Sequence, residues 1–361
     1  MSPPQRSGGA SLNTDSRRVL LEGPIPYTRS AVTEDYREFP ISTNGKLFIR
    51  FTAGSRTCSG TVVHSGPDNH RSVVFTAARC IYRESLGGWA QEVTFVPAYT
   101  STSAPFGEWP ARDVFVPKEW VDGGENPHFD VAALYIPPAA SGEILEKDYT
   151  GGMGLRWNQG FKNQPTEAFA YPGTPFTGQR LYRCVSETRS NLPQPPGVGD
   201  PMLATGCDLP QEGTAGGGWI VHDPAADDSF LTSVFSEKPR NETEVSLGPY
   251  FGSTVAGLYR AAVNPTTHRM SITLRLKGHL RALGRIKARD GYKPCRINAP
   301  IRIQRKKSGK WRTVRRTHSR STGDYKVRLP DRRGRYRASS PAGLVDDDNR
   351  CSAAKSGTRR Y

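Results

Sequence analysis

The sequence predicts an all-β protein, and three observations support this. The chain of 361 residues holds 37 Gly and 29 Pro, and only 35% of its residues are hydrophobic, which is typical of a turn-rich protein. Short runs of β-favouring residues recur along the chain, separated by clusters of Gly, Pro, Asn and Asp. No apolar run reaches the ~18 residues that a membrane-spanning helix needs, so we expect no membrane span.

The first part of the chain divides into a leader and a strand-rich body. Residues 1–39 are rich in Ser, Pro and charge and show no sustained periodicity, which predicts a disordered leader. From Gly45 onward, many short strands with turns between them suit a sandwich or barrel. The predicted strands are Lys46–Phe51, Thr57–Val63, Ser72–Thr76, Glu92–Val96, Asp113–Val116, Val131–Ile136, Glu167–Tyr171, Arg180–Val185, Trp219–Val221 and Phe230–Phe235.

The last part of the chain is strongly basic. Residues 263–361 hold 28 Lys and Arg against 6 Asp and Glu, a net charge of +22, whereas the rest of the chain carries −6. This asymmetry predicts a separate domain, with a linker and its first strands in 263–294 and a small β-sandwich in 295–355. Its predicted strands are Ser271–Leu276, Ala299–Arg305, Lys310–Arg316, Tyr325–Leu329 and Gly334–Ala338. Apolar and basic residues alternate along them, so one face would be buried and the other basic.

Four segments of the body carry the order of parts that a serine hydrolase needs. Such an enzyme combines a nucleophile, a base, a carboxylate that orients the base, and donors for an oxyanion. The segments are Cys58-Ser59-Gly60-Thr61-Val62-Val63, Thr76-Ala77-Ala78-Arg79-Cys80, Phe129-Asp130-Val131-Ala132-Ala133-Leu134 and Gly213-Thr214-Ala215-Gly216-Gly217-Gly218-Trp219.

These segments resemble the trypsin-like serine peptidases of chymotrypsin fold, in particular the secreted actinobacterial kind. The resemblance covers roughly residues 40–262. It implies a peptidase domain of two six-stranded antiparallel β-barrels, to which the basic β-sandwich is appended.

Two of the three triad positions depart from the family. The resemblance places the family's histidine at Arg79 and its nucleophilic serine at Ala215, and only Asp130 matches. A guanidinium stays protonated and cannot act as a general base, and a methyl group has no nucleophilic atom. Loss of triad members leaves only about 10³–10⁴-fold catalysis over water. The sequence therefore predicts an inactive peptidase homologue, and an active serine endopeptidase is the alternative.

The resemblance also makes predictions about the surroundings of the triad. Backbone N–H groups of Gly213 and Ala215 would form the oxyanion hole, and Gly218, which replaces a common proline, would loosen that loop. We expect an ion pair between Arg79 and Asp130, the alternative being an Arg79 side chain in solvent. Ser233 is a candidate for the strand that pairs with substrate, or else a plain strand serine.

Other side chains near these segments could in principle take over catalysis. The nearby histidines are expected on loops or the surface, although on a strand His128 would share the face of Asp130. Thr214 neighbours the nucleophile position, but we expect its side chain to point elsewhere on a tight turn. The histidines considered are His64, His70 and His128.

Six cysteines allow 15 pairings. The resemblance implies Cys58–Cys80; Cys184 and Cys207 flank the loop before the serine motif, and Cys295 and Cys351 bracket the basic domain. Disulfides favour a secreted protein, yet residues 1–27 lack an apolar signal-peptide core. An upstream start, another export route or reduced cysteines would each reconcile the two, and we favour the first. No Cys-x-x-Cys pair occurs, so neither a thiolate zinc site nor any other metal or cofactor is predicted.

The expected partners follow from the two halves of the chain. The peptidase-like body would bind a peptide or protein. The basic domain would attract a polyanion, and for a secreted chain an anionic cell-surface polymer is a better match than nucleic acid. Its aromatic residues are expected in the core, and a basic sandwich without a defined ligand is the alternative. These aromatic residues are Trp311, Tyr325 and Tyr336.

Overall fold

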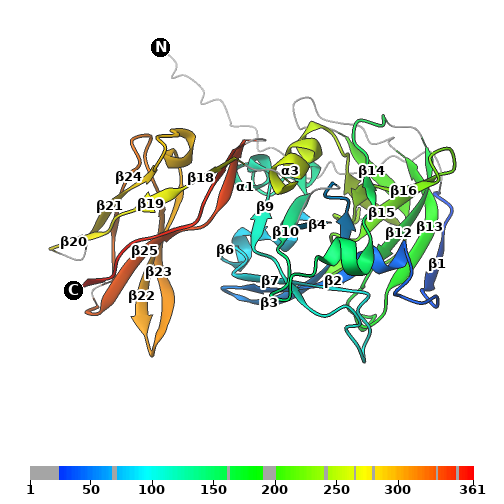
Figure 1. Ribbon diagram of the computed structural model, residues 1–361, viewed down its shortest axis with the longest axis horizontal. Coiled ribbons are helices and arrows are strands. Elements are labelled where there is room, and N and C mark those ends of the chain that lie inside the picture. The colour runs from blue at the N-terminus through cyan, green and yellow to red at the C-terminus, as the bar shows by residue number, and fades with distance from the viewer. Residues whose placement is uncertain are drawn as a thin grey trace, which may run out of the picture.

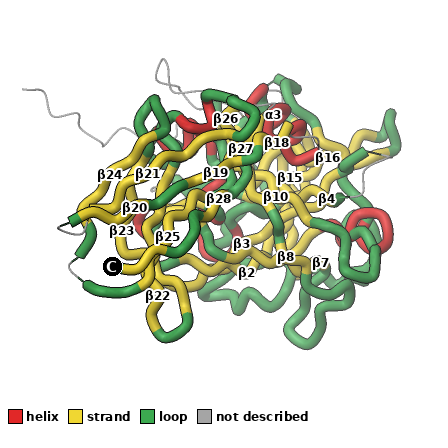
Figure 2. Tube along the Cα trace, turned by 60° about the vertical axis from the view of Figure 1, so that its left-hand side comes forward, coloured by secondary structure: helices red, strands yellow, loops and turns green. Residues whose placement is uncertain are grey.

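The computed structural model describes residues 24–66, 71–160, 163–189, 201–239, 243–263, 266–278, 281–330, 332–346 and 349–361. In these ranges the regular structure is almost entirely strand, with few short helices between (Figure 2). The predicted all-β fold class is thus confirmed.

The first barrel is a seven-stranded sheet in the order β8-β7-β2-β3-β4-β10-β9. The two-residue strand β8 extends one edge of this sheet, and the other six strands correspond to the six that the resemblance predicts. Leu47, Val74, Phe95 and Leu134 fill its interior, each inaccessible to solvent. The strands are β2 (Asn44–Phe51), β3 (Gly54–Val63), β4 (Ser72–Thr76), β7 (Glu92–Pro97), β8 (Trp109–Pro110), β9 (Asp113–Phe115) and β10 (Ala132–Ile136).

The second barrel is an eight-stranded sheet in the order β11-β16-β15-β12-β13-β14-β17, with β1 paired to β13. Here too six longer strands form the wall, and the short β1 and β11 account for the excess over the predicted six. Cys184, Trp219 and Phe235 lie in its core. The strands are β1 (Thr28–Ala31), β11 (Gly154–Leu155), β12 (Gln164–Ala170), β13 (Tyr182–Arg189), β14 (Met202–Gly206), β15 (Gly218–Asp223), β16 (Asp228–Val234) and β17 (Val245–Pro249).

A third apolar core joins the two barrels. Phe75 and Ala133 of the first barrel pack in the same cluster as Tyr171 and Leu231 of the second. Helix α3 (Ser253–Val263) covers this cluster and contributes Val255 and Leu258, among others. The barrels are therefore fixed against each other, with the candidate centre along their seam.

The leader prediction is wrong for its second half. Residues 1–23 lie outside the described part, but Thr28–Ala31 form β1, which pairs antiparallel with β13. This strand shows no apolar alternation, because backbone hydrogen bonds hold it and its side chains are mostly exposed. The buried residues Ile25 and Val32 anchor the segment at either end.

The C-terminal module contains two sheets around one apolar core, in agreement with a small sandwich. One sheet has the order β19-β21-β20 with β24 beside β21, and the other β23-β22-β25-β28 with β29 beside β25. The sheets extend from Met270 to Arg360, beyond the predicted 295–355. The strands are β19 (Met270–Ile272), β20 (Arg275–Lys277), β21 (Arg281–Ala288), β22 (Pro300–Lys307), β23 (Lys310–His318), β24 (Asp324–Arg328), β25 (Arg335–Ser340), β28 (Ala354–Lys355) and β29 (Arg359–Arg360).

A three-stranded sheet connects this module to the second barrel. β18 (Thr266–His268) runs parallel to β27 (Asn349–Cys351), which pairs with β26 (Gly343–Asp346). Figure 1 shows the module at one end of the molecule and the two barrels at the other. Among the described residues, the contacts between the module and the first barrel include an ion pair of Arg350 with Asp113 and a hydrogen bond from the Arg316 side chain to the Thr52 hydroxyl at 3.2 Å.

The remaining elements are short. No helix in the described ranges has both the length and the apolar character that crossing a membrane requires. These elements are the hairpin β5 (Tyr82–Arg83) and β6 (Gly88–Trp89), the helices α1 (Lys118–Asp122) and α2 (Gln211–Thr214), the 3₁₀ turns Ile41–Thr43, Ala78–Cys80, Glu84–Leu86, Pro127–Phe129 and Pro294–Arg296, and the π-helical turn η5 (Leu145–Thr150).

Candidate active centre

Arg79 and Asp130 meet because their strands are paired. Ala132 of β10 lies opposite Thr76 of β4, so the residues just outside these strand ends are neighbours. The Arg79 Nε donates to Asp130 Oδ2 at 2.5 Å, and the Arg79 backbone N–H donates to Oδ1 at 2.8 Å. Asp130 is inaccessible to solvent, and the Arg79 side chain is 9% exposed. The predicted ion pair is confirmed, and the alternative of a solvent-exposed Arg79 is wrong.

Ser236 completes this network, and the sequence analysis did not single it out. Its hydroxyl donates to Asp130 Oδ2 at 2.6 Å and accepts a hydrogen bond from Arg79 Nη2 at 3.0 Å. The Gln211 side chain donates to the Ser236 carbonyl at 3.1 Å. We call Arg79, Asp130 and Ser236 the central network. The Arg79 guanidinium, the Asp130 carboxylate and the Ser236 hydroxyl each have a hydrogen-bond partner within the protein.

The side chain of Ser233 fits the alternative prediction, a plain strand serine. Its side chain is inaccessible to solvent and its hydroxyl donates to the Pro249 carbonyl at 2.8 Å. Ser233 pairs with Trp219 inside β16, whereas the chain reaches the centre only after β16 ends at Val234. Ser236, three residues later in the sequence, is the serine that contacts Asp130.

Ala215 closes the far side of the centre with a methyl group. It is 5% exposed and belongs to the apolar cluster of the first barrel, together with Ala78 and Cys80. Its carbonyl accepts the Ser59 N–H at 2.9 Å, which ties the loop to β3. No oxygen or sulfur side-chain atom therefore stands at this position.

The predicted oxyanion donors are only partly available. The N–H of Ala215 donates to the Gln211 carbonyl at 3.2 Å, so it would have to leave that acceptor to bind an oxyanion. Gly213 has φ +74°, and a Cβ there would lie 2.3 Å from the Tyr171 carbonyl, so this position requires glycine.

Gly218 does not loosen the loop as we expected. It begins β15 and is buried, and a Cβ there would lie 2.4 Å from the Thr61 hydroxyl oxygen. Glycine at this position allows the two barrels to approach closely.

None of the alternative catalytic residues with described positions replaces the missing base or nucleophile. His64 interacts with Glu146 at 3.2 Å, not with Asp130. His128 lies in the 3₁₀ turn Pro127–Phe129 and not on a strand, so the shared face with Asp130 does not arise. Thr214 is 2% exposed, so its hydroxyl is inaccessible to a substrate. His70 lies outside the described residues.

All three disulfide expectations are confirmed: Cys58–Cys80, Cys184–Cys207 and Cys295–Cys351. The first joins β3 to the turn that carries Arg79, and the second joins β13 to the segment before α2. Among the described residues, no group of three His, Cys, Asp or Glu side chains could hold a metal ion.

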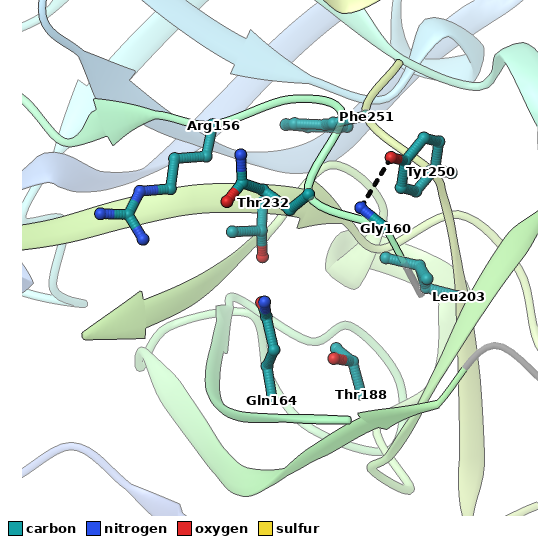
Figure 3. Close-up of a pocket in the computed structure, with 9 residues that line it drawn as sticks. Arg156, Gly160, Gln164, Thr188, Leu203, Thr232, Tyr250 and Phe251 are labelled. Carbon is teal, nitrogen blue, oxygen red and sulfur yellow. Dashed lines mark hydrogen bonds between the residues drawn. The ribbon is translucent and has the colours of Figure 1, made fainter. Parts of the chain in front are cut away.

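Two hollows in the barrels lie at different places: one is next to the loop of Gly213 and the other is not. A recess of about 380 Å³ is lined by Phe48, Arg56 and Thr57 and by Glu212, the neighbour of Gly213. By contrast, the cavity in Figure 3 measures only about 20 Å³ and lies in the second barrel, around Thr232. It has room for about one water molecule.

Comparisons with known proteins agree with this architecture. No family model matches the chain. It is 26% identical over 136 residues to a glutamyl endopeptidase of Bacillus licheniformis, a match that spans 36% of this chain and 40% of that protein.

Two solved structures resemble the fold. The protease Anisep of Arthrobacter nicotinovorans is 26% identical with a TM-score of 0.55, covering 65% of this chain and 99% of that one. The thermostable serine protease AL20 of an extremophilic microorganism is 25% identical with a TM-score of 0.52, covering 62% of this chain and 97% of that one. In its two strand-rich barrels and in the order of its segments, the chain resembles these serine proteases of chymotrypsin fold.

Proposed function

We propose that this chain is a catalytically inactive peptidase homologue that binds a peptide or protein segment beside its altered centre. The central network carries the proposal: a guanidinium bound to Asp130 and Ser236 stands where the family has its base, and the Ala215 methyl stands where it has its nucleophile. Three disulfides in the described residues favour an oxidising compartment, so we assign the protein an extracellular location.

The recess beside Glu212 supports retained peptide binding. It combines an aromatic ring, Phe48, with the charged side chains of Arg56 and Glu212, and its volume of about 380 Å³ suits side chains of an extended peptide. The recess lies next to the loop of Gly213, and neither Arg79 nor Ala215 lines it.

A fluorophosphonate probe tests the loss of catalysis, since it labels only an activated serine. We expect no labelling of the protein as it stands. The double variant Arg79→His/Ala215→Ser should gain labelling, because it restores base and nucleophile next to Asp130. The single variant Ala215→Ser is the matched control and should stay unlabelled, because Arg79 cannot accept a proton. Labelling of the unaltered protein would instead establish an active endopeptidase.

Fluorescein-labelled, unfolded casein tests the binding role. Its anisotropy should rise on addition of the protein without release of fragments, and Thr57→Trp, which fills the recess, should weaken the effect. If the anisotropy does not change at any accessible concentration, the binding role is wrong even when catalysis is absent.

A specific surface feature favours a second role for the module. The tip of the hairpin β22–β23 exposes Lys306, Lys307 and Lys310 around the turn at Ser308 and Gly309. Such a cluster attracts polyanions through release of their counterions. We therefore propose that the module binds an anionic surface polymer.

Heparin chromatography at increasing salt measures this attraction. The triple variant Lys306→Gln/Lys307→Gln/Lys310→Gln should elute at clearly lower salt than the unaltered protein. The variant Lys118→Gln/Lys147→Gln/Lys238→Gln, with the same change of net charge on the barrels, should elute near the unaltered position. Equal shifts for both variants would show attraction to net charge alone.

A further inference from the structure

The junction between the first barrel and the module encloses a cavity of about 450 Å³. Its barrel side comes from the β5–β6 hairpin and α1, which lie on the side of the barrels that faces the module (Figure 1). Its module side comes mainly from β22, β23 and the segment 340–345. Volumes of 300–1,000 Å³ at domain interfaces are typical of small-molecule sites.

Apolar side chains from both sides line the cavity. Trp89 and Val121 come from the barrel, and Met270 and Ile301 from the module. Ile297, at its border, is 50% exposed and adds to this apolar lining. A ligand with an apolar body would cover this surface.

Two arginines give the cavity its charge. Arg302 of β22 and Arg316 of β23 are directly opposite each other, so their side chains leave the same face of the sheet. That face is the one opposite Ile301 and Ile303, which point into the module core. Both arginines line the cavity.

These two guanidiniums have no carboxylate partner in the described part of the chain. Partial burial, together with the charge of Arg316, lowers the pKa of Arg302. The acidic residue at the cavity, Asp122, is 4.0 Å from Lys118 on the same helix. Two like charges on a partly buried face are unfavourable, and a bound anion would offset them.

We infer that this cavity binds a small amphipathic organic anion: an apolar ring or short chain in contact with Trp89 and Ile297, and a carboxylate, sulfonate or phosphate group at Arg302 and Arg316. The site is separate from the central network and does not depend on whether the barrels catalyse a reaction. Both the barrel and the module contribute to it, so the ligand would also strengthen their association.

The fluorescent sulfonate 1-anilinonaphthalene-8-sulfonate is a suitable probe, because it combines an apolar ring system with one anionic group. We expect saturable binding of one probe molecule per chain. Arg302→Gln and Arg316→Gln should each weaken binding at least about tenfold, since each removes a charge-assisted contact. Arg316 is exposed, so its replacement leaves the fold intact even if Arg302→Gln does not.

Two further variants separate the cavity from general surface attraction. Arg312→Gln, on the exposed part of the same strand, removes the same charge away from the cavity and should leave binding unchanged. Gly343→Trp should abolish binding, because Gly343 lines the cavity and a Cβ there meets no atom within 4 Å. Absence of saturable binding, an equal loss with Arg312→Gln, or full binding by Gly343→Trp would each overturn the inference.

Discussion

The buried guanidinium of Arg79 has contacts on several sides. The Asp130 carboxylate, the Ser236 hydroxyl and the ring of Trp120, with its centroid 5.8 Å from Arg79 Cζ, surround the guanidinium. A buried charge of this kind persists only if it is paired, because desolvation otherwise costs several kcal/mol. The network thus makes the altered centre a structural element.

Replacement of Asp130 tests this role at the level of one residue. Asp130→Ala leaves Arg79 buried without its partner and should lower the free energy of unfolding by about 3–5 kcal/mol. Ser236→Ala, which removes one hydroxyl, should cost only about 0.5–1.5 kcal/mol. Urea unfolding at neutral pH measures both. If the double variant Arg79→Leu/Asp130→Leu is no more stable than Asp130→Ala, the cost does not arise from an unpaired charge.

Sequence motifs located part of this centre and missed part of it. Arg79, Asp130 and Ala215 lie in segments of distinctive composition, and the Cys58–Cys80 disulfide lies in two of these segments. Ser236 carries no such signal: it shares a short stretch with Ser233, and only the end of β16 decides which of the two faces the centre. A strand boundary shifted by one or two residues changes that outcome.

Among the elements, the end of β3 and the π-helical turn η5 are joined by a titratable contact. The hydrogen bond from His64 to Glu146 raises the pKa of His64 above its ordinary value of 6.5, against the opposing effect of partial burial. Glu146 also accepts the Ser65 N–H and is itself 7% exposed. Protonated His64 therefore stabilises the attachment of η5 to the first barrel.

This contact gives a pH dependence of defined sign. Because the pKa of His64 is higher in the folded than in the unfolded protein, its stabilisation is complete below pH ~6.5 and is lost as the pH rises through the folded pKa. His64→Gln should thus lower stability in acid, by no more than about 1 kcal/mol since the ring is 56% exposed, and have little effect in alkali.

Midpoints of unfolding in urea, measured between pH 5 and 9, show whether His64→Gln lowers stability more in acid than in alkali. His222→Gln is the control, because His222 is near the Ser229 hydroxyl and not a carboxylate. An effect of His64→Gln that grows towards alkaline pH would contradict the interpretation.

The elements that the sequence predicted share one property: β-branched and aromatic residues in short runs. All ten strands predicted in the body are present, whereas β1, β14, β17, β21 and α3 are among the elements that were missed. β1 is polar, and β21 has small residues at inward positions such as Ala282 and Gly284. For α3, the spacing of Val255, Leu258 and Ala262 would have indicated a helix.

In the whole molecule, Arg350 and Asp113 form an ion pair between the module and the first barrel. Their side chains are 10% and 13% exposed. Burial, with the charges of Arg112 and Arg71, lowers the pKa of Arg350 to about 10. The Asp113 carboxylate is therefore the partner of Arg350 at a place where further guanidiniums lie nearby.

Asp113→Asn should loosen the junction. The substitution keeps the shape but leaves Arg350 unpaired, at a cost of about 3–5 kcal/mol, so the module should move relative to the barrels. Small-angle scattering should show a larger radius of gyration, and limited proteolysis should cleave faster between residues 263 and 281. Glu92→Gln, which breaks an exposed ion pair with Arg50, should change neither. Unchanged scattering of Asp113→Asn would mean that other contacts hold the module.

The parallel pairing of β18 with β27 determines when the module can fold during synthesis. β18 follows directly after α3, but its partner strand, Asn349–Cys351, comes near the end of the chain. The barrels are complete in sequence before the module begins, so they can fold first on the ribosome. The pairing of β18 with β27 cannot form until Asn349–Cys351 have been made, and β18 lacks this partner strand throughout that interval.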